Sequence, residues 1–288
     1  MHAKLLIPAL AVLSLGSGGC YIGDFGDGMR YHRDFHYSFP ISSRGRVEVE
    51  TFNGSVEITT WDQNTVDISG SKWGPTESAA DALRIDTDHT ADSVSIRAVR
   101  PSEWRSNLGA HFEIKVPKGA VLDRIVTSNG PIRTEDCAGP ARMRTSNGSI
   151  HVQGLQGRLD AQTSNGSIEL MDVTGDATLH TSNGHIHAQR LNGAADAETS
   201  NGGIDLELPG KLAHDVRAHT SNSGITVRLQ EPLNAHVMAS TSNSSIHTDF
   251  DVRMSGEFSK RRLEGSIGSG GPMIDLSTSN GSIRILKM

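Results

Sequence analysis

The amino-acid sequence predicts an all-β fold: a right-handed parallel β-helix, or β-solenoid, with about 18–21 residues per coil. The first observation behind this prediction is a repeated phrase, Thr-Ser-Asn-Gly-x-Ile. The second is an alternation of apolar and polar residues on both sides of that phrase, which is typical of strands with one buried face. The third is the length of the unit, which is too short to hold a helix between parallel strands. Such units can only stack, each strand pairing with its equivalent one coil away.

The repeated phrase has a fixed spacing. Copies in the middle of the chain begin 18 residues apart, and the next two begin 21 residues apart with Ser in place of Gly. A further copy begins at Thr278, and a related version, Thr51-Phe-Asn-Gly-Ser-Val56, lies far upstream. Fixed self-similarity over this many copies indicates stacked repeats. With paired strands about 4.8 Å apart, the copies from Thr127 onward would form a rod about 40 Å long.

Each unit contains two predicted strands. Counted from its Thr, positions 6 and 8 are mostly apolar between polar neighbours, so they predict the inward face of a first strand. Positions 15 and 17 predict the inward face of a second strand, and their small residues indicate two sheets lying close together. Right-handed winding is the default for parallel connections. Position 13 is Gly, which marks a turn that needs a positive φ or a close backbone approach.

The Ser-Asn-Gly part of the phrase is predicted to form a corner, because Asn and Gly tolerate the left-handed conformation. In a parallel stack the Asn side chains of successive corners would align. Stacked amides can satisfy one another's hydrogen bonds, so an amide ladder is expected along this corner. The predicted structural ladder contains Asn129, Asn147, Asn165, Asn183, Asn201, Asn222, Asn243 and Asn280.

The region before the repeats is interpreted as a cap. A solenoid needs a terminal unit that covers the edge of its first coil, and residues 41–120 show β-like alternation without close repeats. Within this N-terminal β-rich cap, Gly74-Pro75-Thr76 before residues 77–83 predicts one short helix with Pro at its start. Further strands are predicted at residues 83–86, 93–98 and 110–116.

Residues 121–288 are the predicted solenoid. Its regular pattern breaks at residues 249–272, which are predicted to form an irregular loop. The strand from Ser282 to Lys287 is expected to be an open sheet edge, with Arg284 and Lys287 as the charges that protect it from pairing with other chains.

The N-terminus resembles an export signal. His2 and Lys4 precede an apolar run that is too short to span a bilayer. The small residues before Cys20 are similar to a bacterial lipoprotein cleavage site, which implies a signal peptide at 1–20 and a lipid anchor on Cys20. Ser17 departs from that pattern, since such sites usually carry Leu, and secretion without a lipid or an uncleaved anchor are the alternatives. The expected location is the cell envelope, and Tyr21 favours the outer membrane if the cell is Gram-negative. Residues 21–40 are interpreted as a tether.

The net charge and the cysteine content limit which classes of function the sequence can support. The formal net charge is −6, and it becomes −7 when residues 1–19, with one Lys and no acid, are removed. A negative chain is a poor partner for nucleic acid, whose binding depends on neutralising phosphates. Cys137 stands at position 11, where other units carry Leu or Val, and is therefore interpreted as a small buried apolar residue.

Several motifs together resemble one known family. They are the Thr-Ser-Asn-Gly-x-Ile series, the upstream Asn53-Gly54-Ser55-Val56-Glu57-Ile58, the Val116-Pro117 step into the repeats, and the closing run from Gly268 through Leu276 to the last copy. This combination is similar to the bacterial putative-adhesin family over about residues 41–288. The resemblance implies a single-stranded β-helix, often exported, in a family of envelope domains without a characterised function. It implies no catalytic or binding residues.

One side-chain cluster is a weak candidate for a metal site. His151, Glu169 and His187 fall in one outward column at position 7, and His185 lies on the same face as His187. Imidazole and carboxylate ligands could bind Zn²⁺ or Ni²⁺. The alternative is a solvated face, because alternating charge down an exposed column is what any parallel ladder favours. No metal or cofactor is therefore expected.

The sequence predicts no enzyme. It lacks the Gly-x-Ser-x-Gly, phosphate-loop, His-Glu-x-x-His and Cys-x-x-Cys motifs. The predicted function is a non-catalytic, envelope-anchored module: an adhesin-like or scaffold surface for an envelope or host polysaccharide or protein. The alternatives are a metal-binding or sensor protein, and a polysaccharide lyase or hydrolase by analogy with other β-helices. Asp160 and Asp196 come nearest to an acid/base pair, but Thr178 separates them in the column.

Overall fold

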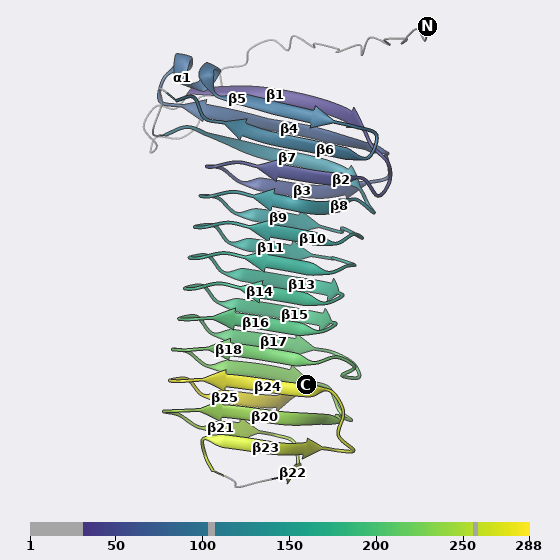
Figure 1. Ribbon diagram of the computed structural model, residues 1–288, viewed down its shortest axis with the longest axis vertical. Helices are drawn as coiled ribbons and strands as arrows, with labels where there is room; N and C mark the ends of the chain where they lie inside the picture. The colour runs from purple at the N-terminus through teal and green to yellow at the C-terminus, as the bar shows by residue number, and fades with distance from the viewer. Residues whose placement is uncertain (1–30, 103–106, 256–258) are drawn as a thin grey trace, which may run out of the picture.

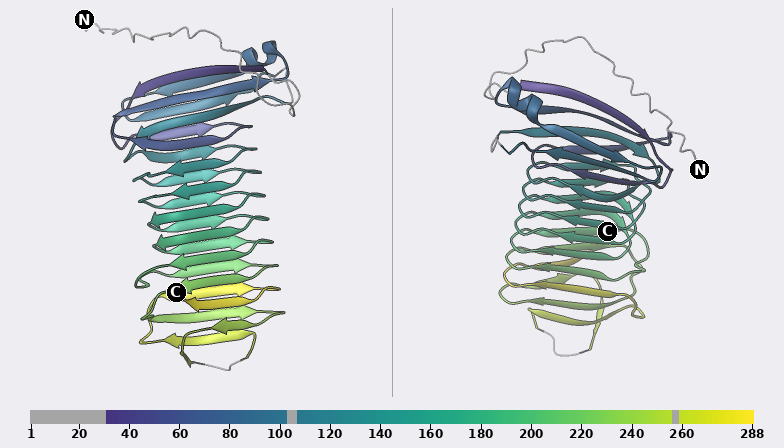
Figure 2. Two further views of the ribbon diagram at one scale, coloured as in Figure 1. Left: turned by 180° about the vertical axis from the view of Figure 1, so that it is seen from behind. Right: turned by 45° about the horizontal axis from the view of Figure 1, so that its top comes forward.

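The computed structural model describes residues 31–102, 107–255 and 259–288, in which two sheets of 12 and 13 strands pack face to face in one long stack (Figures 1 and 2). Sheet A contains, in spatial order, β1 (Tyr31–Pro40), β4 (Thr65–Gly74), β7 (Gly109–Pro117), β3 (Val56–Trp61), β9 (Ile132–Glu135), β11 (Ile150–Gln153), β13 (Ile168–Thr174), β15 (Ile186–Asn192), β17 (Ile204–Leu208), β19 (Ile225–Leu229), β25 (Ile283–Lys287) and β21 (Ile246–Thr248). Sheet B contains β22 (Val252–Met254), β23 (Arg262–Ile267), β20 (Ala235–Thr241), β24 (Met273–Thr278), β18 (Val216–Thr220), β16 (Ala195–Thr199), β14 (Ala177–His180), β12 (Leu159–Gln162), β10 (Ala141–Arg144), β8 (Val121–Val126), β2 (Arg46–Glu50), β6 (Ser93–Val99) and β5 (Arg84–His89). The predicted all-β solenoid is confirmed.

Each regular coil contributes one strand to each sheet, in parallel register with its neighbours. Ile168, for example, lies opposite Ile150 on one side and Ile186 on the other. The period-two alternation holds, because the apolar residues at positions 6, 8, 15 and 17 point inward and are buried. The core is therefore a continuous column of Ile, Leu, Val and Ala between the sheets, as the repeat predicts.

The start of the stack differs from the predicted cap. Residues 46–61 form a coil of the solenoid itself, because β2 pairs in parallel with β8 and β3 pairs in parallel with β9. The covering strands come from the segment that follows: β4 and β7 pair antiparallel beyond β3, while β6 and β5 extend sheet B. Alternation alone could not separate these roles, since a coil and a cap strand both bury every second residue.

Part of the predicted tether is an edge strand. β1 pairs antiparallel with β4 along its whole length. Its alternate side chains pack inward, and Phe35 lies edge-on to Phe112 with ring centroids 5.4 Å apart. The rest of that tether, the predicted signal peptide and Cys20 lie outside the described residues. No helix in the described part of the chain is long and apolar enough to cross a membrane.

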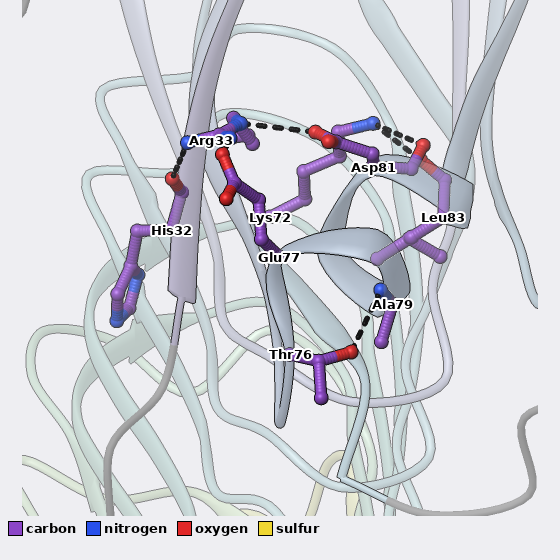
Figure 3. A network of polar contacts seen from close by, with 8 residues as sticks. All are labelled: His32, Arg33, Lys72, Thr76, Glu77, Ala79, Asp81 and Leu83. Carbon is purple, nitrogen blue, oxygen red and sulfur yellow. Dashed lines mark hydrogen bonds and ion pairs between the residues drawn. The ribbon is translucent and has the colours of Figure 1, made fainter.

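The predicted short helix is confirmed as α1 (Glu77–Ala82), and polar contacts hold both of its ends (Figure 3). The Thr76 hydroxyl accepts a hydrogen bond from the backbone N–H of Ala79 at 3.1 Å, which is an N-cap. Lys72 Nζ donates to the carbonyl oxygens of Asp81 and Leu83 at 3.2 and 2.6 Å. Burial lowers the pKa of Lys72. Arg33 on β1 pairs with Asp81 at 2.9 Å, so the helix is joined to both β1 and β4.

The corner glycines are required for a different reason from the one predicted. Among the described residues, none of the corner Asn residues and only Gly54 of the corner Gly residues has a positive φ. The Gly is instead needed for close stacking, since a Cβ on Gly166 would overlap the carbonyl oxygen of Gly148 in the preceding coil. Positive φ recurs at two other places in the coil. At position 10, Asp136, Asp172 and Arg190 adopt it at 55–57° and Gly154 at 68°, and at the predicted position 13, Gly175 has a φ of 131° and Gly193 of 159°.

The C-terminal part of the stack also departs from the expectation. The strand β25 is not an open edge: it lies between β19 and β21 and pairs with both. The segment predicted as an irregular loop at 249–272 contains β22 and β23, which pair antiparallel with each other, while β23 also pairs with β20. Sequence order suggested an edge, because the last strand of a chain that stacks in order would lie at the end of the stack. This chain instead places its last strand inside the stack, and no local sequence pattern indicates that.

Candidate functional site

The Asn ladder is present and continuous. Each Asn Nδ2 donates to the Oδ1 of the Asn in the neighbouring coil at 2.6–2.8 Å. Its spatial order differs from its order in the sequence, because Asn280 lies between Asn222 and Asn243. The ladder also includes Asn53, whose own Nδ2 donates to the carbonyl oxygen of Leu108 at 2.8 Å. The upstream copy of the phrase could have indicated this ninth member.

The Thr of each phrase carries a role that the sequence did not reveal. These Thr residues are buried. Thr181 Oγ1 donates to the carbonyl oxygen of Gly166 in the preceding coil at 3.0 Å and accepts from the N–H of Gly184 in its own coil at 3.2 Å. The same pair of bonds recurs at Thr145, Thr163 and Thr199. Each hydroxyl therefore joins two coils at the corner and leaves no buried polar group unpaired there.

The position-7 column, defined as Glu57, Arg133, His151, Glu169, His187 and Asp205, runs down the outer face of sheet A in register. His151 Nδ1 lies 3.0 Å from Glu169 Oε2, and Arg133 Nη1 lies 3.3 Å from Glu57 Oε1. Neighbouring side chains of opposite character thus pair along the column. A shallow groove on this face is lined by Arg133, Thr134, Glu135, His151, Val152, Gln153, Glu169, Leu170, Met171, His187 and Gln189.

The four candidate metal ligands do not converge on one point. His185 Nδ1 accepts a hydrogen bond from the backbone N–H of Gly203 at 3.1 Å. His187 Nε2 lies 2.9 Å from Gln189 Nε2, so it engages the next outward column. In the part of the chain that the structure describes, no group of three or more His, Cys, Asp or Glu side chains is arranged to hold a metal ion. The four residues therefore make three separate contacts: His151 with Glu169, His185 with Gly203, and His187 with Gln189.

The two carboxylates considered for catalysis lie on the outer face of sheet B. Asp160 and Asp196 stand on either side of Thr178 in the strand register, about 9.6 Å apart at two strand spacings. Each faces an arginine: Asp160 lies 3.6 Å from Arg142, and Asp196 lies 4.0 Å from Arg217. The two acids therefore have different partners and are not brought together over a common cleft.

Two further titratable groups have perturbed environments. Burial raises the pKa of the Cys137 thiol to about 12, with a smaller effect from the Asp136 charge. Cys137 is thus a neutral, buried thiol, consistent with its place among Leu and Val at position 11. On the surface, the hydrogen bonds from Arg190 at 2.5 and 2.7 Å lower the pKa of the Asp172 carboxyl. Both of these residues have the positive φ of position 10, so their pairing spans two coils at the bend.

Three solved structures match most of this chain at low sequence identity. A putative adhesin from Bacteroides fragilis NCTC 9343 is 15% identical, with a TM-score of 0.46, 88% of this chain covered and 97% of that one. A putative cell adhesion protein from Clostridium sporogenes ATCC 15579 is 9% identical, with a TM-score of 0.29 and coverage of 90% and 100%. A putative adhesin from Parabacteroides distasonis ATCC 8503 is 9% identical, with a TM-score of 0.32 and coverage of 90% and 98%.

Comparison with curated proteins finds no match. The family model described as Toastrack DUF4097 matches residues 45–286, nearly the whole region in which the strands and the Asn ladder lie. In agreement with the resemblance that its repeats carry, the chain belongs to the Toastrack DUF4097 family.

Proposed function

We propose that this protein is a non-catalytic, adhesin-like module of the cell envelope that presents the faces of its solenoid to a polysaccharide or protein partner. A lipid on Cys20 would hold it in the membrane, and in a Gram-negative cell that membrane would be the outer one. The observation that carries the proposal is the arrangement of charged groups, which pair with their neighbours in columns.

Catalysis would need a different arrangement. General acid/base chemistry requires groups that converge on one reacting bond, at distances set by that bond. On both faces of the described stack, the candidate groups are instead engaged with near neighbours. Asp160 with Arg142 and His151 with Glu169 are pairs one strand apart, and His187 contacts Gln189 on its own strand. Such a surface is suited to many weak contacts with an extended partner.

The groove on sheet A is the proposed contact surface. Met171 is 39% exposed in it, between the amides of Gln153 and Gln189 in neighbouring strands. The apolar side chain has a hydrogen-bonding amide on each side, at the strand spacing of about 4.8 Å. These groups offer both apolar and polar contacts to a polymer that lies along the stack. The enzyme alternative has no such supporting observation.

The binding test uses the purified protein with a panel of envelope and host polysaccharides. Cosedimentation with a polymer and release of new chain ends are recorded together. We expect retention without new ends, and loss of retention in Met171→Lys. Thr178→Lys, which changes the outer face of sheet B at the same part of the stack, is the matched control and should bind normally. New chain ends that disappear in Asp160→Asn would establish the enzyme alternative instead.

Anchoring is tested separately in cells. Metabolic labelling with a radioactive fatty acid should mark the wild-type chain, and the chain should sediment with membranes. Cys20→Ser should abolish the label and release the protein from the membrane fraction, whereas Cys137→Ser should do neither. Membrane association without a label in the wild type would show that another part of the chain holds it there.

A further inference from the structure

The order of coils in space differs from their order in the chain. After β19 the chain does not fill the next position but places β20 and β21 one coil further on. It then forms β22 and β23 at the end of sheet B, and only afterwards returns to the position that it had left. In Figure 1 the yellow strands β24 and β25 accordingly lie among green strands of lower number. We call residues 273–287 the inserted coil, and the position between β18–β19 and β20–β21 the acceptor position.

The inserted coil pairs with both of its neighbours in both sheets. β24 runs parallel to β18 and β20, and β25 runs parallel to β19 and β21. At its corner, Asn280 donates to Asn222 at 2.8 Å and accepts from Asn243 at 2.7 Å. Its inward side chains Ile274, Leu276, Ile283 and Ile285 are fully buried. The acceptor position thus provides backbone pairing on both sides, an amide rung and apolar pockets.

A short glycine-rich segment leads into the inserted coil. Residues 268–272 read Gly-Ser-Gly-Gly-Pro, and Gly268 and Gly270 have φ values of 61° and 78° that favour Gly. This segment crosses β20 to bring β24 to the far side of it from β23. Polar contacts then fix the far end of the coil: Lys287 Nζ lies 2.8 Å from Glu231 Oε1, and the Met288 N–H donates to the carbonyl oxygen of Leu229 at 3.1 Å.

We propose that the acceptor position is a binding site for an extended peptide that carries Thr-Ser-Asn-Gly-x-Ile between two alternating apolar strands, and that the inserted coil of a second copy of this chain binds there by exchange. Adding a strand to a sheet edge is a known mode of peptide recognition. Exchange of an identical element is a route by which protein copies associate. A second copy would make in the acceptor position the contacts that the chain's own coil makes. The exchange is therefore opposed by the opening of the coil and by the translational and rotational freedom lost on association.

The site should select its peptide at the corner. A Cβ on Gly281 would overlap the carbonyl oxygen of Ser223, and the Thr278 hydroxyl donates to that same oxygen at 2.9 Å. Backbone cannot move aside as a flexible side chain can. A peptide with Gly281→Ala should therefore be excluded even though its strands keep the same apolar pattern.

The first experiment uses the full chain with a protease recognition sequence introduced between Ser269 and Gly270, and its uncleaved form must melt at the wild-type temperature. After cleavage we expect the fragment from Gly270 onward to stay bound in size-exclusion chromatography. A fluorescent peptide of residues 271–288 should then replace it, and the Gly281→Ala peptide should not. Glu231→Ala, which removes the ion pair with Lys287, should speed replacement by about two- to fivefold.

The second experiment tests a second copy without cleavage. One chain carries Ser240→Cys and the other Ser277→Cys, both with Cys20→Ser, because residues 240 and 277 are paired neighbours on β20 and β24. Mixing under oxidising conditions should give a disulfide-linked heterodimer, whereas Ser240→Cys with Thr178→Cys should give none. Loss of the fragment on cleavage, equal entry of the Gly281→Ala peptide, or absence of the linked heterodimer would each overturn the proposal.

Discussion

At the scale of the residue, the corner of each coil is built from three residues with three separate tasks. Asn joins coils through its amide, Thr joins them through its buried hydroxyl, and Gly lets the backbones approach. The Asn and Thr contacts recur from coil to coil, and the Gly approach recurs except where the phrase has Ser223 or Ser244. A substitution at one corner therefore disturbs contacts with the coils on both sides. Substitutions at these positions should therefore cost more than their size or exposure suggests.

The close approach of the corners can be tested on two adjacent glycines. A Cβ on Gly202 would overlap the carbonyl oxygen of Gly184, whereas a Cβ on Gly203 would come no closer than 3.2 Å, to His185 Nδ1. We expect Gly202→Ala to lower the free energy of unfolding by about 3 kcal/mol, as overpacking does. Gly203→Ala should cost less than about 1 kcal/mol. Equal effects in urea denaturation would contradict the stacking argument.

The contribution of the Thr hydroxyl to stability can be separated from that of the side chain's size by substitutions at Thr181. Thr181→Val keeps the shape but leaves the carbonyl of Gly166 and the N–H of Gly184 without their partner. Leaving buried groups unpaired should cost about 2 kcal/mol. Thr181→Ser retains the hydroxyl and should recover most of that loss in the same denaturation measurement. If Val is tolerated better than Ser, methyl packing rather than hydrogen bonding dominates the site.

The buried thiol makes a prediction about pH. Burial raises the pKa of Cys137 from 9.0 to about 12, so the unfolded chain releases this proton at a lower pH than the folded chain does. Stability should therefore fall as the pH rises from 9 towards 12. Cys137→Val, which copies Val173 at the same position, should remove part of that fall while leaving the melting temperature at pH 7 nearly unchanged. An identical pH slope in both proteins would exclude the thiol as its source.

At the scale of the element, the sequence predicted the repeated strands well because burial alternates with a period of two. The alternation of residues such as Ile168 and Leu170 with polar neighbours indicates which side chains point inward. The regular spacing of the Asn residues indicates that they stack. The left-handed position 10 was not predictable, because Asp136, Asp172 and Arg190 give it no common residue type. The close approach of the backbones at the corners was equally hidden, so the sequence could not decide whether a Gly serves φ or close packing.

The strand register is tested by one buried charge. Ile168 is fully buried between Ile150 and Ile186, so Ile168→Asp places a carboxylate in the apolar column without a partner. We expect a loss of about 4 kcal/mol or more in the free energy of unfolding. Glu169→Asp, one residue away and on the outer face, is the control and should change stability by less than about 0.5 kcal/mol. Similar losses for the two variants would mean that the assigned inward face is wrong.

At the scale of the whole molecule, the stack is held mainly by contacts between neighbouring coils. The strands pair in register from β3 to β21 in sheet A, with no coil touching more than its two neighbours through backbone bonds in the described residues. The sequence predicted this one-dimensional organisation, but it did not predict the order in which the C-terminal coils lie in space. That order depends on contacts between residues distant in the sequence, since the inserted coil shares the Thr-Ser-Asn part of the phrase with both of its neighbours.

A one-dimensional stack should lose structure from its ends rather than all at once. In hydrogen–deuterium exchange, the amides of β11 and β13, which have coils on both sides, should exchange most slowly. Those of β22, a strand of three residues at the edge of sheet B, should exchange fastest. Under slightly destabilising urea the boundary of protection should move inward coil by coil. A single protection level shared by β13 and β22 would show instead that the molecule opens as one cooperative unit.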